Sequence, residues 1–244
     1  MFLDCDDCLR DATTLAFILS QISTHKDTDL FRLGTFRELD DGSFTPIDCT
    51  NETWLHGKIV RRDFLRQNNI RFSEELMCNE DIYWNLRLST FSPKTINIPT
   101  EVYFWRNNPD SLTRALGAED FIARYFHEYI KARHYGLRDG KPMSDGTANR
   151  IIQTSVYSFV IINSSDMNKR PEFKALAEEA FRAFIKDYRY IFDQHNQPEK
   201  IEPYFLSMIQ AHLGKLQYRI SLFDWLDSIT PKDYHKPEKA KKSK

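Results

Sequence analysis

The sequence predicts an α/β fold in which a partial, Rossmann-like sheet is followed by a helical C-terminal region. Three observations support this fold class. A short apolar run at residues 1–5 leads directly into acidic residues, as at the end of a strand in an open sheet. Residues 95–105 are rich in β-branched and aromatic side chains. From residue 117 onward, apolar residues recur instead at the spacing of helices.

The first 114 residues alternate between predicted strands and predicted helices. Apolar residues between positions 9 and 22 recur at helical spacing, so a helix is expected after the acidic turn. Asp40, Asp41 and Gly42 form a hairpin turn signal. Asp63 and Asn79 are predicted to cap two further helices, the second ending near residue 89. The predicted strands cover residues 1–5, 29–39, 43–47, 58–61 and 95–105.

The rest of the chain is predicted to be helical, with a different tail. Apolar residues between positions 173 and 192 follow i, i+3, i+4 spacing closely. Weaker patterns predict helices near 118–135, 147–163, 199–213 and 217–228. Residues 231–244 carry six Lys against one Asp and one Glu, which predicts a disordered tail. The predicted parts are therefore residues 1–114, 115–230 and 231–244.

Composition excludes several classes of protein. The 244 residues are 41% hydrophobic and 28% charged, with a net charge of −1, which is typical of a globular protein without a general attraction for nucleic acid. No long apolar run or signal-peptide pattern is present, and four cysteines do not make a disulfide framework. A cytoplasmic location is expected. The basic tail follows aromatic residues, so peripheral contact with the inner face of a membrane is one expectation and a solubilising tail the other.

Two acidic clusters are the candidate functional residues. Asp4, Asp6 and Asp7 lie within four positions and repel one another unless a cation or hydrogen-bond donors neutralise them. Carboxylates are ligands for Mg²⁺ or Mn²⁺, which usually bind together with substrate phosphates. Glu80 and Asp81 form the second cluster, and either cluster alone also suits the N-terminus of a helix. Together they suggest one group that holds a diphosphate and another that takes a proton.

Other candidate residues have ordinary alternatives. His56 is a candidate metal ligand or a structural histidine, and Lys58 lines a pocket or stays solvated. Arg106 is a candidate phosphate clamp or a surface arginine. Cys5 and Cys8 form a C-x-x-C pair, which allows a zinc module, although no second close pair of cysteines accompanies it.

Five segments within residues 1–114 resemble, in order, motifs of the family 2 glycosyltransferases. The acidic segment F-L-D-C-D-D resembles the F-L-D-S-D-D motif, and N-E-D at residues 79–81 resembles the E-D motif. Residues 115–244 match only loosely. The other three segments are H-G-K-I-V-R-R-D-F-L at residues 56–65, N-N-I-R-F at residues 68–72, and Y-F-W-R at residues 103–106 followed by S-L-T at residues 111–113.

The resemblance implies a GT-A fold and the transfer of a sugar from a nucleotide-diphosphate sugar to a hydroxyl of a glycan, lipid-linked or protein acceptor, with inversion. It assigns Asp4 and Asp6 to the metal-binding D-x-D element, with Asp6 the better Mg²⁺ or Mn²⁺ ligand and Asp4 nearer the ribose. It makes Asp81 the candidate base. Lys58 and Arg106 become contacts of the pocket or of the diphosphate.

Two departures from the family pattern qualify this expectation. Cys5 stands where Ser is commoner. The nucleobase-binding half of the family does not precede residue 1, so a truncated form with weak transfer activity and a tendency to self-associate is expected. The alternative hypothesis is a non-catalytic binding or assembly protein derived from a glycosyltransferase.

Overall fold

The computed structural model describes residues 1–50, 53–140, 145–194, 222–230, 232 and 234. The chain forms two compact units. The first unit contains Met1–Ala118 and Tyr135–Lys141, and the second contains Glu119–His134 and Pro142–Lys244. The predicted boundary at residue 114 stays a prediction. Each unit is described by itself below.

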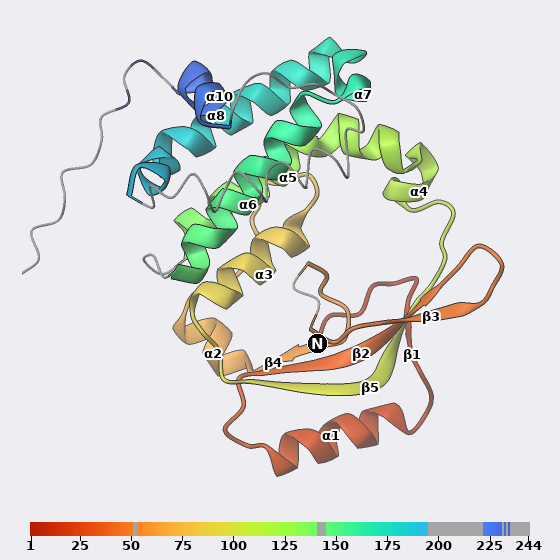
Figure 1. The fold of residues 1–244 in the computed structure, drawn as a ribbon. Coiled ribbons are helices and arrows are strands. Elements are labelled where there is room, and N and C mark those ends of the chain that lie inside the picture. The colour runs from red at the N-terminus through yellow and green to blue at the C-terminus, as the bar shows by residue number, and fades with distance from the viewer. Residues whose placement is uncertain (51–52, 141–144, 195–221, 231, 233, 235–244) are drawn as a thin grey trace, which may run out of the picture. The chain divides into compact units, whose positions relative to one another are not determined.

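A mixed sheet of five strands forms the centre of the first unit (Figure 1). Its order is β1-β5-β2-β3, and β4 pairs with β2. Only β2 and β5 are parallel neighbours; the other pairs are antiparallel. The strands are β1 (Cys8–Leu9), β2 (Leu30–Glu38), β3 (Phe44–Ile47), β4 (Lys58–Val60) and β5 (Thr95–Trp105). This sheet and the helices after it confirm the predicted α/β fold class.

Helices cover both faces of this sheet. The helices of this unit before Gly117 are α1 (Thr14–Thr24), α2 (Arg62–Gln67), α3 (Glu80–Thr90) and the short α4 (Leu112–Leu116), of which α1 and α3 lie on the two faces. Helix α1 lies along one face and α3 on the opposite side (Figure 1). Ile18 of α1 packs with a buried cluster from β2 and β5 that includes Phe31, Leu33, Val102 and Tyr103. Burying such side chains contributes about 1.5–3 kcal/mol each.

The pairing of β2 with β5 changes register at Gly34. A Cβ atom on Gly34 would lie 3.0 Å from backbone atoms of Thr100 and Glu101, which is tighter than an ordinary van der Waals contact, so glycine favours this close approach of the two strands. The irregularity lies just after Pro99, near which the sequence predicted an interruption. On the C-terminal side of this irregularity, Tyr103 is paired with Thr35. This pairing fixes the position of the C-terminal end of β5.

Some predicted elements near the N-terminus are wrong. Residues 1–5 form no strand, and Met1, Phe2 and Leu3 are exposed. The backbone turns there instead, because the Asp7 N–H donates to the Asp4 carbonyl at 3.1 Å, and pairing begins only at Cys8. Helix α1 starts at Thr14 and not near residue 9.

Helix starts were predicted with mixed success. Asp63 lies in the first turn of α2, whose N-cap is Arg61, so Asp63 is not the cap. Asn79 is the N-cap of α3, as predicted, although its side chain makes no capping hydrogen bond.

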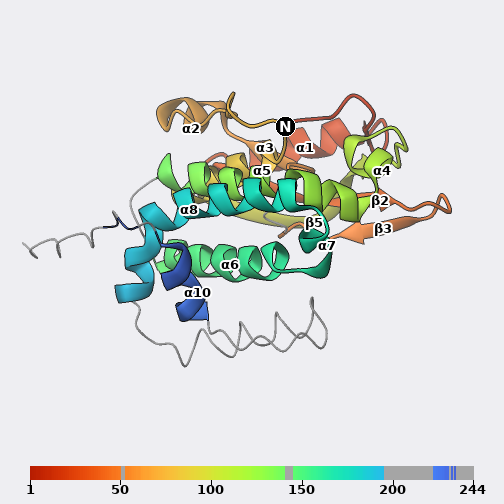
Figure 2. The ribbon, with the colours of Figure 1, turned by 90° about the horizontal axis from the view of Figure 1, so that it is seen from above.

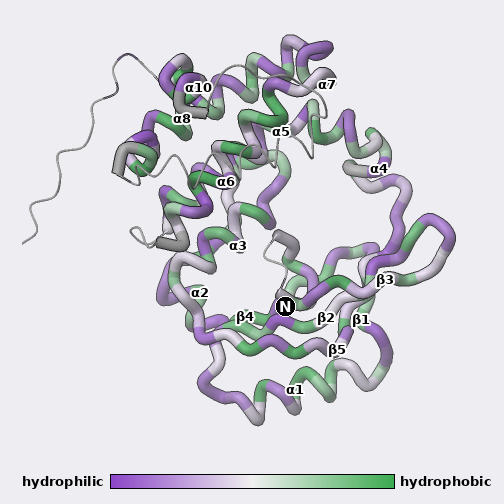
Figure 3. The backbone as a smooth tube through the Cα atoms, viewed as in Figure 1, coloured by the Kyte–Doolittle hydropathy of each residue, from purple (hydrophilic) through white to green (hydrophobic). Residues whose placement is uncertain are grey.

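The described part of the second unit is helical, as the apolar spacing predicted, and no described residue beyond 120 forms a strand. Helix α8 contacts α6, α7 and α10, and Figure 2 shows α6 and α8 running alongside each other. Hydrophilic and hydrophobic residues alternate along α8 in Figure 3. The helices are α5 (Ala118–Arg138), which extends into both units, α6 (Asp145–Ile162), α7 (Ser165–Asn168), α8 (Pro171–Gln194) and α10 (Leu222–Ile229).

The core of this unit is rich in aromatic rings. Phe181 stacks on Trp225 at 4.9 Å between ring centroids, and Phe159 meets the same indole edge-on at 4.7 Å. The predicted helix at 199–213 lies outside the described residues, as does the tail beyond 230 except for Lys232 and Tyr234. Among the described helices, none combines the length and apolarity that crossing a membrane requires.

Candidate functional site

Asp7 is the fixed carboxylate of the first acidic cluster. Its side chain is 1% exposed. The Tyr103 hydroxyl donates to its Oδ2 atom at 2.5 Å, and the Arg106 N–H donates to its Oδ1 atom at 2.8 Å. Burial raises the pKa of Asp7, and these two donors oppose that rise. The end of β5 therefore holds Asp7 in one orientation.

His56 faces two of the acidic residues. Its Nε2 atom lies 3.8 Å from Asp4 Oδ2 and 3.9 Å from Asp7 Oδ2. Both distances exceed that of a hydrogen bond, which leaves space between the three side chains. Their ligand atoms all lie within 4.8 Å of one another. Burial lowers the pKa of His56, so the imidazole is neutral at pH 7 and able to act as a ligand.

The loop before β4 positions this histidine. Gly57 has a φ of +67°, and a Cβ atom there would lie 2.4 Å from the Leu33 carbonyl oxygen. Glycine therefore allows the loop to cross β2 closely enough to bring His56 inward. The imidazole packs against the rings of Tyr103 and Trp105, with centroids 5.0 and 4.8 Å away. Its buried Nδ1 atom has no hydrogen-bond partner among the described residues.

Asp6 lies apart from this group. Its side chain is exposed, and Asn108 Nδ2 donates to its Oδ2 atom at 2.8 Å. The resemblance pairs Asp4 with Asp6, whereas the structure brings Asp4 together with Asp7 and His56. The role of Asp6 as a metal ligand stays a prediction. Sequence reasoning named Asp7 only as a member of the acidic run and His56 only as one alternative, because nothing local marks either residue.

Lys58 is almost completely buried, with 3% of its surface exposed. Its ammonium donates to Asn85 Oδ1 at 2.9 Å and to the Trp54 carbonyl. Asn85 in turn donates to the carbonyl of Asp81 at 2.9 Å. The charge of Lys58 lowers the pKa values of both His56 and Asp81. The charge of Lys58 therefore acts on both acidic regions; its contact with a diphosphate stays a prediction.

Asp81 occupies the first turn of α3 and is half-buried. Burial raises its pKa to about 6, and the neighbouring charge of Glu80 adds to the rise. The Ile82 N–H donates to Asp81 Oδ1 at 2.7 Å, and this hydrogen bond opposes the rise in pKa. A carboxylate with a pKa near 6 is ionised at neutral pH and still basic enough to accept a proton efficiently.

Arg106 links the site to the hairpin between β2 and β3. Its guanidinium is exposed and pairs with Glu38 at 2.9 Å, while its N–H holds Asp7. The next residue, Asn107, donates through its N–H to the same Glu38 carboxylate at 2.9 Å. The contact of Arg106 with a diphosphate stays a prediction.

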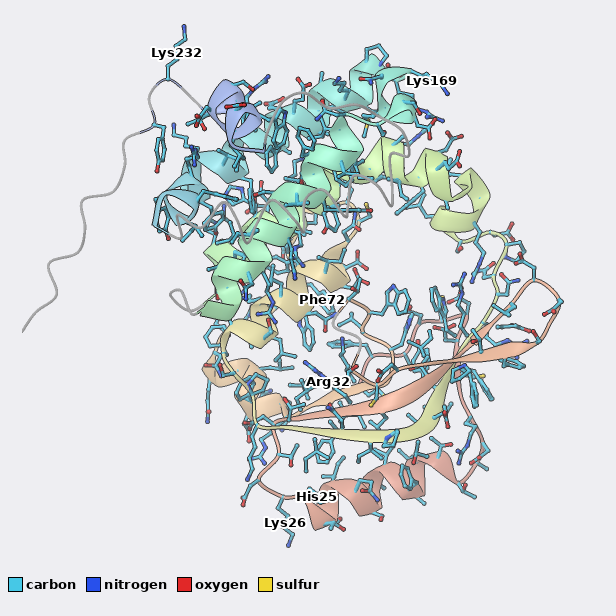
Figure 4. All side chains as sticks on the ribbon, in the orientation of Figure 1. His25, Lys26, Arg32, Phe72, Lys169 and Lys232 are labelled. Atoms are coloured by element: carbon cyan, nitrogen blue, oxygen red, sulfur yellow. The ribbon has the colours of Figure 1, made fainter. Side chains whose placement is uncertain are left out.

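Aromatic rings connect the N-terminal residues to α3. Phe2 packs edge-on against Phe72 and Trp84, with centroids 5.1 and 5.3 Å apart. Phe72 lies beside α3 on the side of the sheet to which Arg32 points (Figure 4). Trp84 follows Asp81 by one helical turn, so this cluster holds the start of the chain near the second acidic pair. That Asp4, Asp6 and Asp81 face one cleft stays a prediction.

Comparison of the sequence with protein families and with curated proteins finds no match. Among solved structures, the chain is similar to S. aureus TarS 1–349, crystallised in complex with UDP. The TM-score is 0.51 at 15% sequence identity, and the match covers 94% of this chain and 63% of the TarS chain. The chain thus spans less than two thirds of the structure it matches. At this identity, the likeness shows that the two chains share a fold.

Proposed function

We propose that this chain binds a nucleotide-diphosphate sugar and transfers the sugar to an acceptor hydroxyl with inversion. The acceptor oxygen attacks the anomeric carbon and forms the new glycosidic bond. The bond from that carbon to the diphosphate breaks, and the nucleoside diphosphate leaves with the electron pair. Asp81 takes the proton of the acceptor hydroxyl. The observation that carries the proposal is that the ligand atoms of Asp4, Asp7 and His56 lie within 4.8 Å of one another, in a fold similar to that of a protein crystallised with UDP.

The group Asp4, Asp7 and His56 fits a divalent cation. Two carboxylates and a neutral imidazole offer three ligand atoms around a common space, and the buried side chain of Asp7 is already oriented by Tyr103 and Arg106. A mixed oxygen and nitrogen set favours Mn²⁺ over Mg²⁺, which prefers oxygen ligands. A bound cation would neutralise the charge that develops on the leaving diphosphate.

The second candidate function is non-catalytic binding of a nucleotide. Its support is that both cations expected to contact the diphosphate are engaged within the protein. Lys58 is bonded to Asn85, and Arg106 is paired with Glu38. On this hypothesis, the fold binds a nucleoside diphosphate through the cation site and does not position a sugar for attack.

Calorimetric titration of UDP tests the nucleotide site. We expect binding with Mn²⁺, and its loss on chelation. His56→Gln should weaken it by about tenfold or more, because one of three ligands is removed. The matched control is His25→Gln at the end of α1, outside the group (Figure 4). Equal UDP affinity with and without metal would overturn the metal-dependent site.

Turnover separates the two candidate functions. The purified chain would be incubated with UDP-sugars and Mn²⁺, with and without glycan acceptors, and the release of UDP measured. Release that is lost in Asp81→Asn, while UDP affinity is unchanged, supports a transferase. Mn²⁺-dependent UDP binding without any release of UDP from a panel of UDP-sugars supports the binding protein.

A further inference from the structure

A surface cavity of about 390 Å³ lies outside the group Asp4, Asp7 and His56. It is formed where the tip of the β2–β3 hairpin meets the loop after β5 and the helix α4. This volume lies in the range of small-molecule sites. The residues that line it include Arg37, Glu38, Asp40, Asp41, Asn107 and Arg114.

Two arginines give this cavity its chemical character. Arg37 and Arg114 both lie over the Trp105 ring, with Cζ atoms 5.2 and 5.7 Å from its centroid. The Arg114 Nη1 atom donates to the carbonyls of Arg106 and Asn108 at 3.4 and 3.2 Å. Arg37 has no ion pair or side-chain hydrogen bond with any described residue. Stacking on Trp105 orients both guanidiniums and leaves N–H donors unused.

The carboxylates around the cavity already have partners. Glu38 accepts from the guanidinium of Arg106 and from the N–H of Asn107, both at 2.9 Å. Asp40 accepts from Asn107 Nδ2 at 3.0 Å. Asp41 accepts from the N–H and the hydroxyl of Ser43 at 2.9 and 2.6 Å. A carboxylate can only accept hydrogen bonds, so the charged donors that remain unused in the cavity lie on the two arginines. The lining carries three carboxylates against two arginines, a formal charge of −1.

We propose that this cavity is an acceptor subsite, and that Arg37 and Arg114 bind an anionic group carried by the acceptor, a phosphate or a carboxylate. The inference rests on the proposed function, since it assigns the acceptor of the same site. A planar guanidinium pairs with either anion through two parallel hydrogen bonds. The segment from Arg106 to Asn108 connects the cavity to the acidic turn, since it bonds to Asp7, Glu38 and Asp6.

The test compares sugars that differ only in the anion. Glucose 6-phosphate, glucuronate and glucose would be titrated separately into the full chain by calorimetry. We expect measurable binding of one or both anionic sugars and about tenfold or weaker binding of glucose. Comparing the affinities for glucose 6-phosphate and glucuronate shows whether the cavity prefers a phosphate or a carboxylate. Equal affinity for glucose and for both anionic sugars would overturn the proposal.

Variants identify the residues. Arg37→Gln should weaken binding of the anionic sugar by about tenfold, because Arg37 offers an open guanidinium, and adding Arg114→Gln should abolish it. Arg37 is exposed, so its single variant is expected to fold normally. The matched control is Arg66→Gln in α2, which should change nothing. Unchanged affinity in Arg37→Gln would contradict the assignment.

UDP provides an independent readout of the proposed function. With Mn²⁺ present, Arg37→Gln should bind UDP like the unchanged chain. A matching loss of UDP affinity would instead assign the arginines to the donor diphosphate and overturn the acceptor subsite. Failure of UDP to bind the unchanged chain would count against the proposed function, while the titrations with glucose 6-phosphate and glucuronate still decide whether the cavity binds an anion.

Discussion

The two acidic regions of the first unit use the same side chain, and burial raises its pKa in both, but they supply it with different hydrogen-bond donors. Asp7 is buried but receives hydrogen bonds from Tyr103 and Arg106, which oppose the rise in its pKa. Asp81 receives one N–H within its own helix turn, and burial raises its pKa to about 6. The first arrangement fixes a charged group, as a cation site requires, and the second makes a carboxylate a better base. Both residues are aspartates, so the difference between them comes from the hydrogen-bond donors that the surrounding structure provides.

The largest effect is expected from Asp81→Asn. Removing a general base lowers a transfer rate by about 100-fold or more, whereas the asparagine can still accept the Ile82 N–H. Release of UDP from a UDP-sugar would be measured for both chains at pH 7. Unchanged release of UDP by Asp81→Asn would show that Asp81 is not the base, and the two acidic regions would then not differ in this role.

The same substitution should stabilise the fold at neutral pH. The pKa of Asp81 is about 6 when folded and 3.8 in its ordinary state, so the folded chain binds this proton more tightly. The contribution of Asp81 to the free energy of unfolding is fully present below about pH 4 and is lost as the pH rises through about 6. Asp81→Asn should therefore raise the free energy of unfolding by up to about 3 kcal/mol at pH 7 and by far less at pH 4. Urea unfolding at both pH values measures this, and a gain that is independent of pH would contradict it.

Asp7→Asn should act in the opposite direction. The asparagine has one carbonyl oxygen, which accepts from only one of Tyr103 and Arg106, so we expect a loss of about 1–3 kcal/mol of stability. Burial raises the pKa of Asp7, so removing its charge offsets part of this loss at neutral pH. Mn²⁺ affinity should fall by about tenfold or more. Urea unfolding and metal titration provide the two measurements. Unchanged metal affinity in a folded variant would place the cation elsewhere.

Lys58→Met tests the link between the two regions. The ammonium lowers the pKa values of both His56 and Asp81, so its removal should raise both. If Asp81 is the base, the acidic limb of the pH–rate profile should move to higher pH. Stability should also fall, because Asn85 Oδ1 and the Trp54 carbonyl lose a donor. An unmoved acidic limb would show that Lys58 does not set the pKa of the base.

Asp6→Asn should have the smallest effect on stability. The carboxylate is exposed and accepts one described hydrogen bond, from Asn108, so the change should stay within about 0.5 kcal/mol. Metal titration of this variant beside Asp7→Asn sharpens the assignment of the cation site. A larger loss of Mn²⁺ affinity in Asp6→Asn than in Asp7→Asn would favour the D-x-D assignment from the sequence resemblance.

The sequence by itself determined the elements whose signals are local. The hairpin turn at Asp40–Gly42 and the strand of residues 95–105 follow from turn chemistry and β propensity. The helix after Asn79 begins where the sequence predicted it, although the Asn79 side chain makes no capping hydrogen bond. The long helix α8 follows from apolar spacing. Asp81 could be placed at a helix start from the sequence because its neighbours along the chain decide its position.

Only the tertiary structure decided which acidic residues form a group. Residues 1–5 carry an apolar strand pattern, yet pairing with β5 begins at Cys8. Asp7 and not Asp6 is buried because a hydroxyl from Tyr103 reaches it across the sheet. Lys58 is buried because α3 supplies Asn85. These partners lie 27 or more positions away along the chain, so no local pattern encodes them; the desolvation and hydrogen bonding that set the chemistry arise only when the strands and helices pack.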